Sequence, residues 1–450
     1  MKLLADTTDT FDLAQLIKDQ VQGDYIYMYP PRQAYRVMDP ANLVEPIQGS
    51  LSRTAGRPLN LYLHFPFCKQ ICGFCNLYSV ATSLGEDYSG YVGLLAREMA
   101  QWVPLTAGRQ IDTIYLGGGT PSVLPIQQLD RCLTSLEDVF GLTRASVPEI
   151  AIEVAPDTVD EIKLREMREI GITRVNLGLQ TTSDDGLHQI GRRHGFSLAR
   201  KRVEDALNSG FDNVCVDLIY GLPGQDLAAW QSIVRDVLIF EAPTVCAYPL
   251  TLRPNTGFSR RNLDLVGAEQ YQKYEVAREL LGHAGYTQET HVRYILPGVG
   301  GYRQKTNHWA GQDILGLGAG GRGYLHDCDY RNGYTIKRRR SALEAYTANI
   351  SEGRSPYNAG IVLSTDERMR RRVILGLLDL DRARFLAEFG IDVADRFARE
   401  FGELGDLGLV HIDDNSVQLT ENGRKYRDLI AQMFFSRDVW NRIREFDYME

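Results

Sequence analysis

The sequence has no apolar run close to the ~20 residues that a membrane-spanning helix needs. Its first residues, MKLLADTTDTFDLAQL, contain no apolar core of a secretory signal. It also lacks a basic excess, because the formal net charge is -8, whereas general nucleic-acid binding needs a basic face. We therefore expect a cytoplasmic protein without a membrane or a nucleic acid as partner.

Cysteine is scarce, with 7 in 450 residues, and the count is odd. An odd count in a long chain without secretory features argues against a disulfide framework. In a reducing compartment, clustered thiols instead indicate metal binding or catalysis. One such cluster is FPFCKQICGFC, which holds Cys68, Cys72 and Cys75, whereas Cys132, Cys215, Cys246 and Cys328 are spread out and are interpreted as small buried hydrophobic residues.

Strand-like and helix-like segments alternate along the first two thirds of the chain. Most of the strand-like segments are apolar on both faces, as buried parallel strands are. Six such units can form a partial barrel related to the eight-unit barrel, in which functional residues gather where the strands end. The predicted strands are 59–65, 111–117, 149–155, 173–180, 213–222 and 244–250, and the predicted helices are 88–102, 126–140, 158–170, pieces up to 208, 227–240 and 268–284.

These patterns predict an α/β fold built on a partial (β/α)6 TIM-like barrel. Near the C-terminus, helices precede a two-stranded ribbon with an Asp-Asn turn and a Thr-capped helix, which indicates a small winged-helix-like domain. Its mixed charge favours a lid or scaffold role over DNA binding. The expected divisions are an N-terminal arm 1–57, the core 58–300, a glycine-rich loop and connecting segment 301–364, and the C-terminal domain 365–450.

The spacing C-x3-C-x2-C leaves a choice between metals. A structural zinc site needs four ligands, and no second C-x2-C pair is present. Iron–sulfur clusters are held by thiolates, and three thiolates on a four-iron cluster leave one iron free for a cofactor or substrate. The missing fourth cysteine therefore favours an iron–sulfur cluster with one open iron.

This motif, the aromatic Phe74 before its last cysteine and the downstream GGGTP resemble the radical S-adenosylmethionine superfamily. The resemblance implies a [4Fe–4S] cluster held by Cys68, Cys72 and Cys75. Its open iron would bind S-adenosylmethionine, which one electron cleaves to methionine and a 5′-deoxyadenosyl radical. A flavodoxin or ferredoxin is the expected electron donor.

Four further segments, LYLHFPFC, YLGGGTPS, RVNLGLQ and VDLIYGLPGQ, resemble the group named for oxygen-independent coproporphyrinogen dehydrogenase. Members of this group can hold two molecules of S-adenosylmethionine. Three of the residues that this likeness would assign to the second molecule also have structural explanations. Asp217 could have a structural partner, Gln180 could close the barrel rim and Arg192 could be a surface residue. The resemblance implies Tyr62, Phe74, Gly118, Glu153 and Arg322 at the first cofactor, and Gly119, Thr120, Gln180, Arg192, Asp217 and Pro249 at the second.

Two departures from that group direct the predicted function. Leu77 stands where the coproporphyrinogen enzymes carry a further cysteine, and Gln304, Lys305 and His308 replace an H-N-x-x-Y motif of the related haem chaperones. We therefore predict a class C radical methyltransferase or cyclopropanase of natural-product biosynthesis. It would transfer a carbon of the second S-adenosylmethionine, as a methylene radical, to an sp2 carbon of an unsaturated or aromatic small molecule.

Other interpretations remain open at this point. They are a radical oxidoreductase, which would include porphyrinogen-type oxidative decarboxylation, and a haem chaperone. A partner methyltransferase is a further expected partner of the predicted class. On the substrate side, a lone His or Tyr is more often a packed residue than a functional one, and the candidates for proton transfer or radical quenching are Tyr62, His291, Tyr294 and Cys328.

Overall fold

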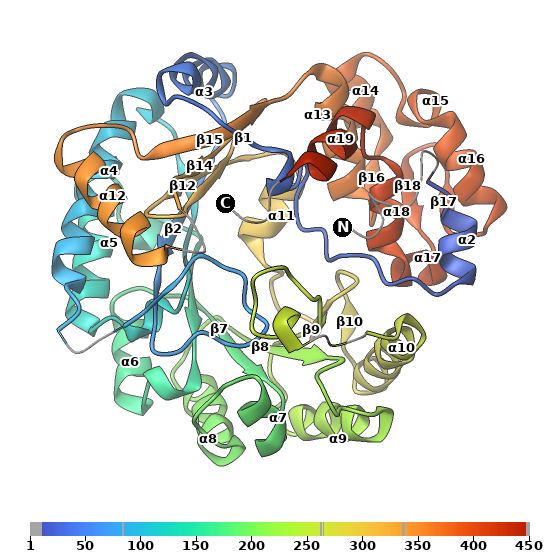
Figure 1. Ribbon diagram of the computed structural model, residues 1–450, viewed down its shortest axis with the longest axis horizontal. Helices are drawn as coiled ribbons and strands as arrows, with labels where there is room; N and C mark the ends of the chain where they lie inside the picture. The colour runs from blue at the N-terminus through green and yellow to red at the C-terminus, as the bar shows by residue number, and fades with distance from the viewer. Residues whose placement is uncertain (1–10, 83–84, 262, 264, 335–337, 447–450) are drawn as a thin grey trace.

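The computed structural model describes residues 11–446 apart from 83–84, 262, 264 and 335–337. Its centre is a parallel sheet with helices along the outer side (Figure 1). In spatial order the six central strands are β2 (Leu59–Phe65), β5 (Ile111–Gly118), β6 (Glu149–Val154), β7 (Arg174–Gln180), β8 (Asn213–Tyr220) and β9 (Thr244–Pro249). The connecting helices are α4 (Tyr88–Thr106), α5 (Ile126–Phe140), α6 (Glu161–Glu169), α7 (Asp184–Gln189), α8 (Phe196–Leu207), α9 (Leu227–Leu238) and α10 (Gly267–His283).

The predicted partial (β/α)6 barrel is confirmed, and burial explains why it forms. Both faces of β2 are buried, as its apolar sequence requires for a central parallel strand. In α5 the buried residues Leu129, Cys132, Leu133 and Leu136 follow the spacing of one helix face, which packs toward the sheet. Cys132 thus has the hydrophobic role that was predicted for it.

The sheet continues beyond β2 into the segment that the sequence predicted to be a glycine-rich loop. β12 pairs with β2 in parallel, and the strands beyond it are antiparallel, so the complete sheet has 13 strands. On the β2 side these strands are β12 (Asp313–Leu317), β13 (Arg322–Tyr324), β14 (Cys328–Asn332), β15 (Tyr357–Val362) and β1 (Arg36–Val37), and on the β9 side β11 (Arg293–Ile295) and β10 (Thr287–Gln288). Between and around them lie α3 (Ala41–Arg53), α11 (Arg303–Trp309), α12 (Arg339–Ser351) and a separate strand pair, β3 (Phe67–Cys68) with β4 (Val80–Ala81).

The C-terminal domain contains the predicted ribbon and capped helix. Asp413 accepts the N–H of Asn415 at 2.8 Å in the turn, and the Thr420 side chain accepts the N–H of Gly423 at 3.0 Å. A third strand, β16, joins the ribbon. The elements are α13 (Thr365–Gly376), β16 (Leu380–Asp381), α14 (Arg382–Phe389), α15 (Val393–Arg396), α16 (Ala398–Asp406), β17 (Val410–Ile412), β18 (Ser416–Leu419), α17 (Glu421–Lys425), α18 (Arg427–Met433) and α19 (Arg437–Glu445).

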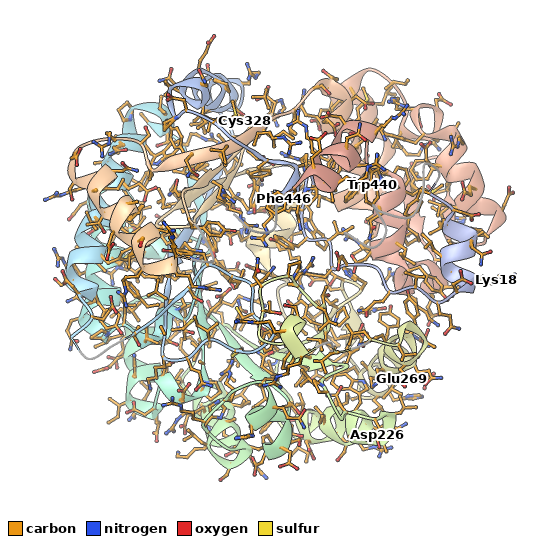
Figure 2. The ribbon with its side chains drawn as sticks, in the orientation of Figure 1. Lys18, Asp226, Glu269, Cys328, Trp440 and Phe446 are labelled. Atoms are coloured by element: carbon orange, nitrogen blue, oxygen red, sulfur yellow. The ribbon has the colours of Figure 1, made fainter. Side chains whose placement is uncertain are left out.

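The N-terminal arm packs into the core of this C-terminal domain. Ile26 and Tyr29 are buried there, and Arg427 donates to the carbonyl of Ile26. The arm helix α2 (Leu13–Lys18) lies beside α17 and α18 in Figure 1, and Trp440, labelled in Figure 2, stacks near Phe11 with ring centroids 6.3 Å apart. Among the residues that the structure describes, we find no helix whose length and apolar character would let it cross a bilayer.

Candidate functional site

The cysteine motif forms a loop closed by the β3–β4 pair. Cys68 is buried, whereas Cys72 and Cys75 are half-buried. The N–H of Cys75 donates to the carbonyl of Cys72 at 3.1 Å, and Arg339 donates to the carbonyl of Ser79 at 2.8 Å. The loop is therefore fixed at both ends, just beyond the carboxyl end of β2.

The three motif thiols fit a multi-iron cluster better than a single ion. A single Zn2+ with bonds of ~2.3 Å would bring its sulfur ligands to about 3.8 Å of one another. The motif thiols are not gathered within 4.8 Å in this way. Burial raises the pKa of Cys75 to about 12 and raises that of Cys68, and the neighbouring motif thiols add to both shifts. Thiolates that bind separate irons of a four-iron cluster are farther apart than the ligands of one zinc ion, which agrees with the spacing of the motif thiols.

The backbone at the end of β5 holds this loop in place. Gly119 and Thr120 donate their N–H groups to the carbonyls of Phe65 and Phe67 at 2.8 and 2.7 Å. A Cβ at position 119 would lie 2.6 Å from the Phe67 carbonyl oxygen and 3.0 Å from the sulfur of Cys68, so the position needs glycine. The sequence predicted that this segment offers backbone groups to a cofactor, but these two N–H groups are used to seat the cysteine loop.

Glu153 in β6 is bonded to the same strand end. Its carboxylate accepts the Tyr115 hydroxyl at 2.8 Å and the N–H of Gly118 at 3.0 Å. Burial raises the pKa of Glu153 to about 7, although both hydrogen bonds lower it. Near neutral pH the group can hold either a proton or a charge, which suits a contact with an ammonium or a hydroxyl of a cofactor.

A cavity of about 270 Å3 opens beside the cysteine loop. Leu77 of the loop and its neighbour Tyr78 form part of the wall, so cavity and loop share a surface. The charged lining groups are Glu153, Lys305 and Arg322, and burial lowers the pKa of Lys305 to about 7. We call this the tyrosine cavity, after the lining residues Tyr25, Tyr27, Tyr62, Tyr78, Tyr302, Tyr324 and Tyr334.

Two of the residues singled out in the sequence, Tyr62 and His308, lie in this wall. The Tyr62 hydroxyl is 3.1 Å from Nδ1 of His64, and its ring stacks on Tyr115 with centroids 5.9 Å apart. Burial lowers the pKa of His308 to about 3, and its Nε2 has no hydrogen-bond partner in the described part of the chain. His308 is therefore a neutral imidazole with one nitrogen free to accept a bond.

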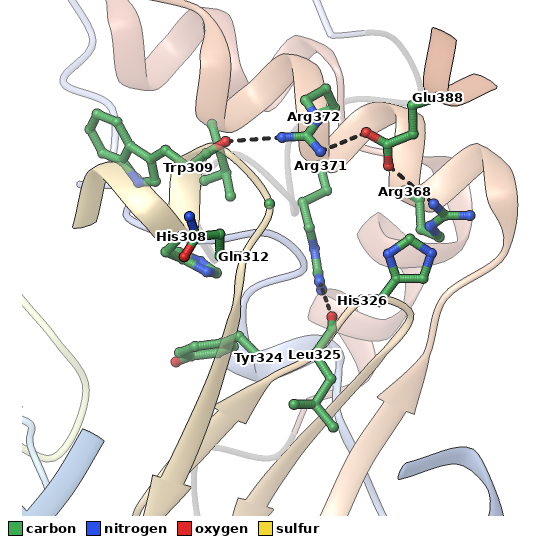
Figure 3. A pocket seen from close by; sticks show the side chains of 12 residues that line it. His308, Trp309, Gln312, Tyr324, Leu325, His326, Arg368, Arg371, Arg372 and Glu388 are labelled. Carbon is green, nitrogen blue, oxygen red and sulfur yellow. Dashed lines mark hydrogen bonds and ion pairs between the residues drawn. The ribbon is translucent and has the colours of Figure 1, made fainter. Parts of the chain in front are cut away.

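A smaller cavity of about 30 Å3 lies against His308 and Tyr324 at the joint with the C-terminal domain. Figure 3 shows Arg372 reaching across this joint, where it donates to the carbonyl of Trp309 at 3.4 Å and to Glu388 at 2.6 Å. A space of this size holds about one water. The small cavity therefore belongs to the packing of the two domains, and the tyrosine cavity is the candidate substrate site.

The residues expected to hold a second cofactor lie outside the lining of the tyrosine cavity. Gln180 has a φ of +73° at the end of β7, and Nε of Arg192 has no hydrogen-bond partner among the described residues. Burial raises the pKa of Asp217 in β8 to about 6. Pro249 lines a separate cavity of about 30 Å3, together with His291. Gln180, Asp217 and Pro249 thus lie at or near the carboxyl ends of β7, β8 and β9, and Arg192 follows in the loop after α7.

Cys215 and Cys246 are buried, as predicted, and in addition their thiols contact each other and a carboxylate. Their sulfurs are 3.6 Å apart on the neighbouring strands β8 and β9, and the sulfur of Cys215 is 3.5 Å from the Asp217 carboxylate. Within the described ranges, these three residues are the group whose possible ligand atoms lie within 4.8 Å of one another. Their separation along the chain gave no sequence signal of this contact.

Three predicted catalytic residues lie away from the tyrosine cavity. Nε2 of His291 is 3.3 Å from the carboxylate of Asp428 in the C-terminal domain. The Tyr294 hydroxyl accepts from Gln288 at 3.2 Å and lines an outer cavity of about 330 Å3. Cys328, labelled in Figure 2, is 0% exposed in the core where β14 packs on α3. None of these three side chains lines the tyrosine cavity.

Sequence reasoning missed several residues of the wall. Tyr78 follows the cysteine motif closely, so its position was a usable signal. Tyr302 and Tyr334 had no such signal, because they reach the cavity only through the pairing of distant segments. Phe74, expected at the first cofactor, packs against a small apolar group that includes Ile190 and Phe258.

Comparison with known proteins agrees with this geometry. Models of the Radical SAM superfamily and of the HemN C-terminal domain match residues 62–237 and 363–426. The Heme chaperone HemW of Synechocystis sp. is 32% identical over 296 residues, or 62% of this chain and 70% of that protein. The oxygen-independent coproporphyrinogen III oxidase of Escherichia coli is 27% identical over 396 residues, or 83% of this chain and 85% of the oxidase. The solved structure of Escherichia coli HemN, 24% identical, has a TM-score of 0.79 over 94% of this chain and 98% of its own, which shows the fold.

These relatives correct the predicted function. They are a haem chaperone and a coproporphyrinogen oxidase, so the prediction of a class C methyltransferase or cyclopropanase in natural-product biosynthesis is wrong. That prediction rested on the replacements at Leu77 and at 304–308. Leu77 and His308 line the same cavity. Residues in a cavity wall can be replaced without a change of fold, so these replacements did not exclude the family. The radical S-adenosylmethionine assignment stands, and with it a [4Fe–4S] cluster and S-adenosylmethionine as cofactors.

Proposed function

This chain belongs to the HemN-like family of radical S-adenosylmethionine proteins, and on that premise we propose that it is an enzyme that oxidises a porphyrin-type tetrapyrrole bearing carboxylates. The observation that carries the proposal is the tyrosine cavity, whose wall includes Leu77 and Tyr78 beside the cysteine loop. Aromatic faces suit a flat macrocycle, and the cations Lys305 and Arg322 suit its acidic substituents.

Cys68, Cys72 and Cys75 are the proposed ligands of the [4Fe–4S] cluster. When bound, the cluster with S-adenosylmethionine supplies a 5′-deoxyadenosyl radical, for which a reduced flavodoxin or ferredoxin is the proposed electron source. Tyr62 and Glu153 lie on the cavity side of the loop. In this proposal Glu153 accepts a hydrogen bond from the cofactor, and the Tyr62 ring helps to keep water from the reacting atoms.

We also propose that a second S-adenosylmethionine binds near the carboxyl ends of β7, β8 and β9. Asp217 would accept from its ammonium, and Arg192 would pair with its carboxylate. Two observations support this assignment: the Nε atom of Arg192 is buried without a hydrogen-bond partner in the described structure, and burial raises the pKa of Asp217 to about 6. Gln180 and Pro249 would form the rim of this second site.

The test is anaerobic reconstitution with iron, sulfide and S-adenosylmethionine, followed by addition of coproporphyrinogen III and a chemical reductant. The expected products are 5′-deoxyadenosine, which has gained one hydrogen atom from a propionate, and a macrocycle in which that propionate has become a vinyl group with loss of carbon dioxide. The one electron left over passes to a one-electron acceptor such as oxidised flavodoxin or ferredoxin. Cys72→Ala should lose both products together with its iron. An iron-loaded wild-type protein that cleaves S-adenosylmethionine but never alters the macrocycle would exclude the oxidation.

A second candidate function is haem transfer, and His308 favours it specifically. A neutral imidazole with a free Nε2 in the cavity wall is a suitable axial ligand for haem iron. In this case haem would bind tightly with little formation of 5′-deoxyadenosine. The discriminating measurement is a haem titration of wild type and His308→Ala, with iron-free porphyrin as control. Equal haem affinity in both proteins argues against His308 as a ligand.

A further inference from the structure

Arg322 and Arg331 stand directly opposite each other on the antiparallel strands β13 and β14. Like charges at opposed positions of a sheet destabilise it, so this pair needs a compensating group. Arg32, from the N-terminal arm, meets them at Tyr334. Arg32 and Arg322 donate to the Tyr334 hydroxyl at 2.7 and 3.2 Å, and the guanidinium of Arg331 lies 4.7 Å from the centre of the Tyr334 ring. We call these four residues the arginine cluster.

The arginine cluster has no Asp or Glu side chain of its own in the described structure. Over residues 11–446, with the gaps given above, the bonding partners of Arg32 and Arg322 are tyrosine hydroxyls, and Nε of Arg331 has no hydrogen-bond partner. A nearby arginine, Arg371, shows the usual alternative, because it pairs with the buried carboxylate of Asp329. All three arginines are half-buried, where a guanidinium gains from an anionic partner. The cluster therefore has excess positive charge that an anion would balance.

The arginine cluster adjoins the tyrosine cavity. Arg322 and Tyr334 line that cavity, as does Tyr27, which accepts from Arg322 at 2.8 Å. The Tyr334 ring lies 5.0 Å, centroid to centroid, from Tyr78, which directly follows the cysteine loop. An anionic group held by the cluster would therefore belong to the same molecule that reaches the reacting centre.

We propose that the arginine cluster is the subsite for a carboxylate of the substrate, with Arg322 as the direct contact and Arg32 and Arg331 as the supporting charges. The proposal rests on the proposed function and adds to it where one carboxylate of the substrate binds, namely at the end of the cavity formed by Arg322 and Tyr334. The two parallel N–H groups of a guanidinium match the two oxygens of a carboxylate. Arg322 can therefore exchange its hydrogen bonds to Tyr27 and Tyr334 for bonds to such a ligand.

Tyr334 links this subsite to pH. Burial alone would raise the pKa of Tyr334, but Arg32, Arg322 and Arg331 lower it to about 6. Above that pH the Tyr334 phenolate neutralises part of the positive charge of the arginines and repels a second anion. Below it the neutral phenol can donate a hydrogen bond to the ligand. Affinity for a carboxylate should therefore rise as pH falls through about 6. The charged and titratable groups around Tyr334 are Arg32, Arg322, Arg331, Arg339, Tyr27, Tyr78 and Tyr324.

The experiment measures binding of iron-free coproporphyrin III, a tetracarboxylate, and of its tetramethyl ester to the full-length, cluster-loaded protein. We expect the acid to bind at least about 10-fold more tightly than the ester, and Arg322→Gln to remove most of that preference, in keeping with one charge-assisted contact. Tyr334→Phe should strengthen acid binding above neutral pH and remove the pH dependence near 6. Arg354→Gln, at an exposed arginine paired with Glu352, is the matched control and should change nothing.

Equal binding of acid and ester, or an unchanged preference in Arg322→Gln, would overturn the subsite while leaving the oxidation to be judged by turnover. If neither macrocycle binds, the proposed function fails, and the subsite is judged by small anions instead. Benzene-1,3,5-tricarboxylate and inorganic phosphate are then added separately, and the tyrosinate absorbance of Tyr334 is recorded against Tyr334→Phe. A response to the tricarboxylate alone supports a carboxylate subsite. A stronger response to phosphate, or no response to either, contradicts it.

Discussion

The buried carboxylate of Glu98 accepts the backbone N–H of Gly318 at 2.7 Å, which joins α4 to the end of β12. The same carboxylate accepts the hydroxyl of Tyr346 at 2.6 Å and the side-chain amide of Asn332 at 2.7 Å. One acidic side chain therefore connects a barrel helix, two strands of the extended sheet and α12.

This junction makes stability depend on pH. Burial raises the pKa of Glu98 from 4.5 to about 7, although its three hydrogen bonds oppose the shift. The folded state then keeps its proton where the unfolded state has lost it, so the free energy of unfolding should fall between about pH 5 and pH 7, by at most about 3 kcal/mol. Urea titrations of wild type and Glu98→Gln across this range test the prediction. The variant should show a flatter pH profile, and parallel profiles would contradict the assignment to Glu98.

Gly119→Ala should displace the cysteine loop. The added Cβ would meet the carbonyl oxygen of Phe67 and the sulfur of Cys68, at 2.6 and 3.0 Å. We expect iron content after reconstitution, and 5′-deoxyadenosine formation with it, to drop by at least about 10-fold while the far-ultraviolet circular dichroism is kept. Gly402→Ala in α16 is the control, because a Cβ there meets nothing within 4 Å. That control should keep its iron and gain about 0.5–1 kcal/mol of helix stability.

Asp217→Asn should lower the number of S-adenosylmethionine molecules bound from two to one. An amide cannot match a carboxylate as acceptor for an ammonium group, so affinity at the second site should fall at least about 10-fold. Equilibrium dialysis against labelled S-adenosylmethionine gives the stoichiometry. Asp138→Asn, on the exposed face of α5, should leave it at two. A wild-type protein that binds a single molecule would refute the two-site proposal outright.

Arg371→Met should unfold the joint between the C-terminal domain and the sheet. Arg371 donates to the carboxylate of Asp329, which is 0% exposed, and to the carbonyl of Leu325 at 3.0 Å. Removal leaves a buried acid with little compensation, at a cost of about 3–5 kcal/mol. Chemical denaturation measures this loss, and Arg354→Met at the surface should cost less than about 0.5 kcal/mol. Similar losses in both variants would show that the pair is not important for stability.

Local pattern was sufficient for the barrel and insufficient for its extension. The strand 59–65 and the helix 126–140 were predicted with the bounds that the structure has, because burial on two faces and on one face leave clear periodicities. β12 was predicted as a glycine-rich loop. Its glycines are there for space, since a Cβ at Gly316 would lie 2.0 Å from the carbonyl oxygen of Arg322 on the neighbouring strand. A strand of that kind can be recognised only once its partner is known.

The same limit applied to the site. Cys68, Cys72 and Cys75 are close in sequence, and their spacing alone indicated the chemistry. The residues of the arginine cluster come from the arm and from two hairpin strands, and no spacing connects them. His291 and Tyr294 have suitable chemistry but face other cavities, because residue type does not determine which cavity a side chain enters.

The N-terminal arm belongs to two structural units at once. Ile26 and Tyr29 are part of the C-terminal core, whereas Tyr25 and Tyr27, their neighbours in sequence, form part of the wall of the tyrosine cavity. No residue beyond Tyr334 is part of that wall in the described structure. Damage to the C-terminal domain, for example by a protease, would nevertheless release the arm and admit solvent to the cavity in which the radical forms. Catalytic integrity would then be lost through a region that never touches the substrate.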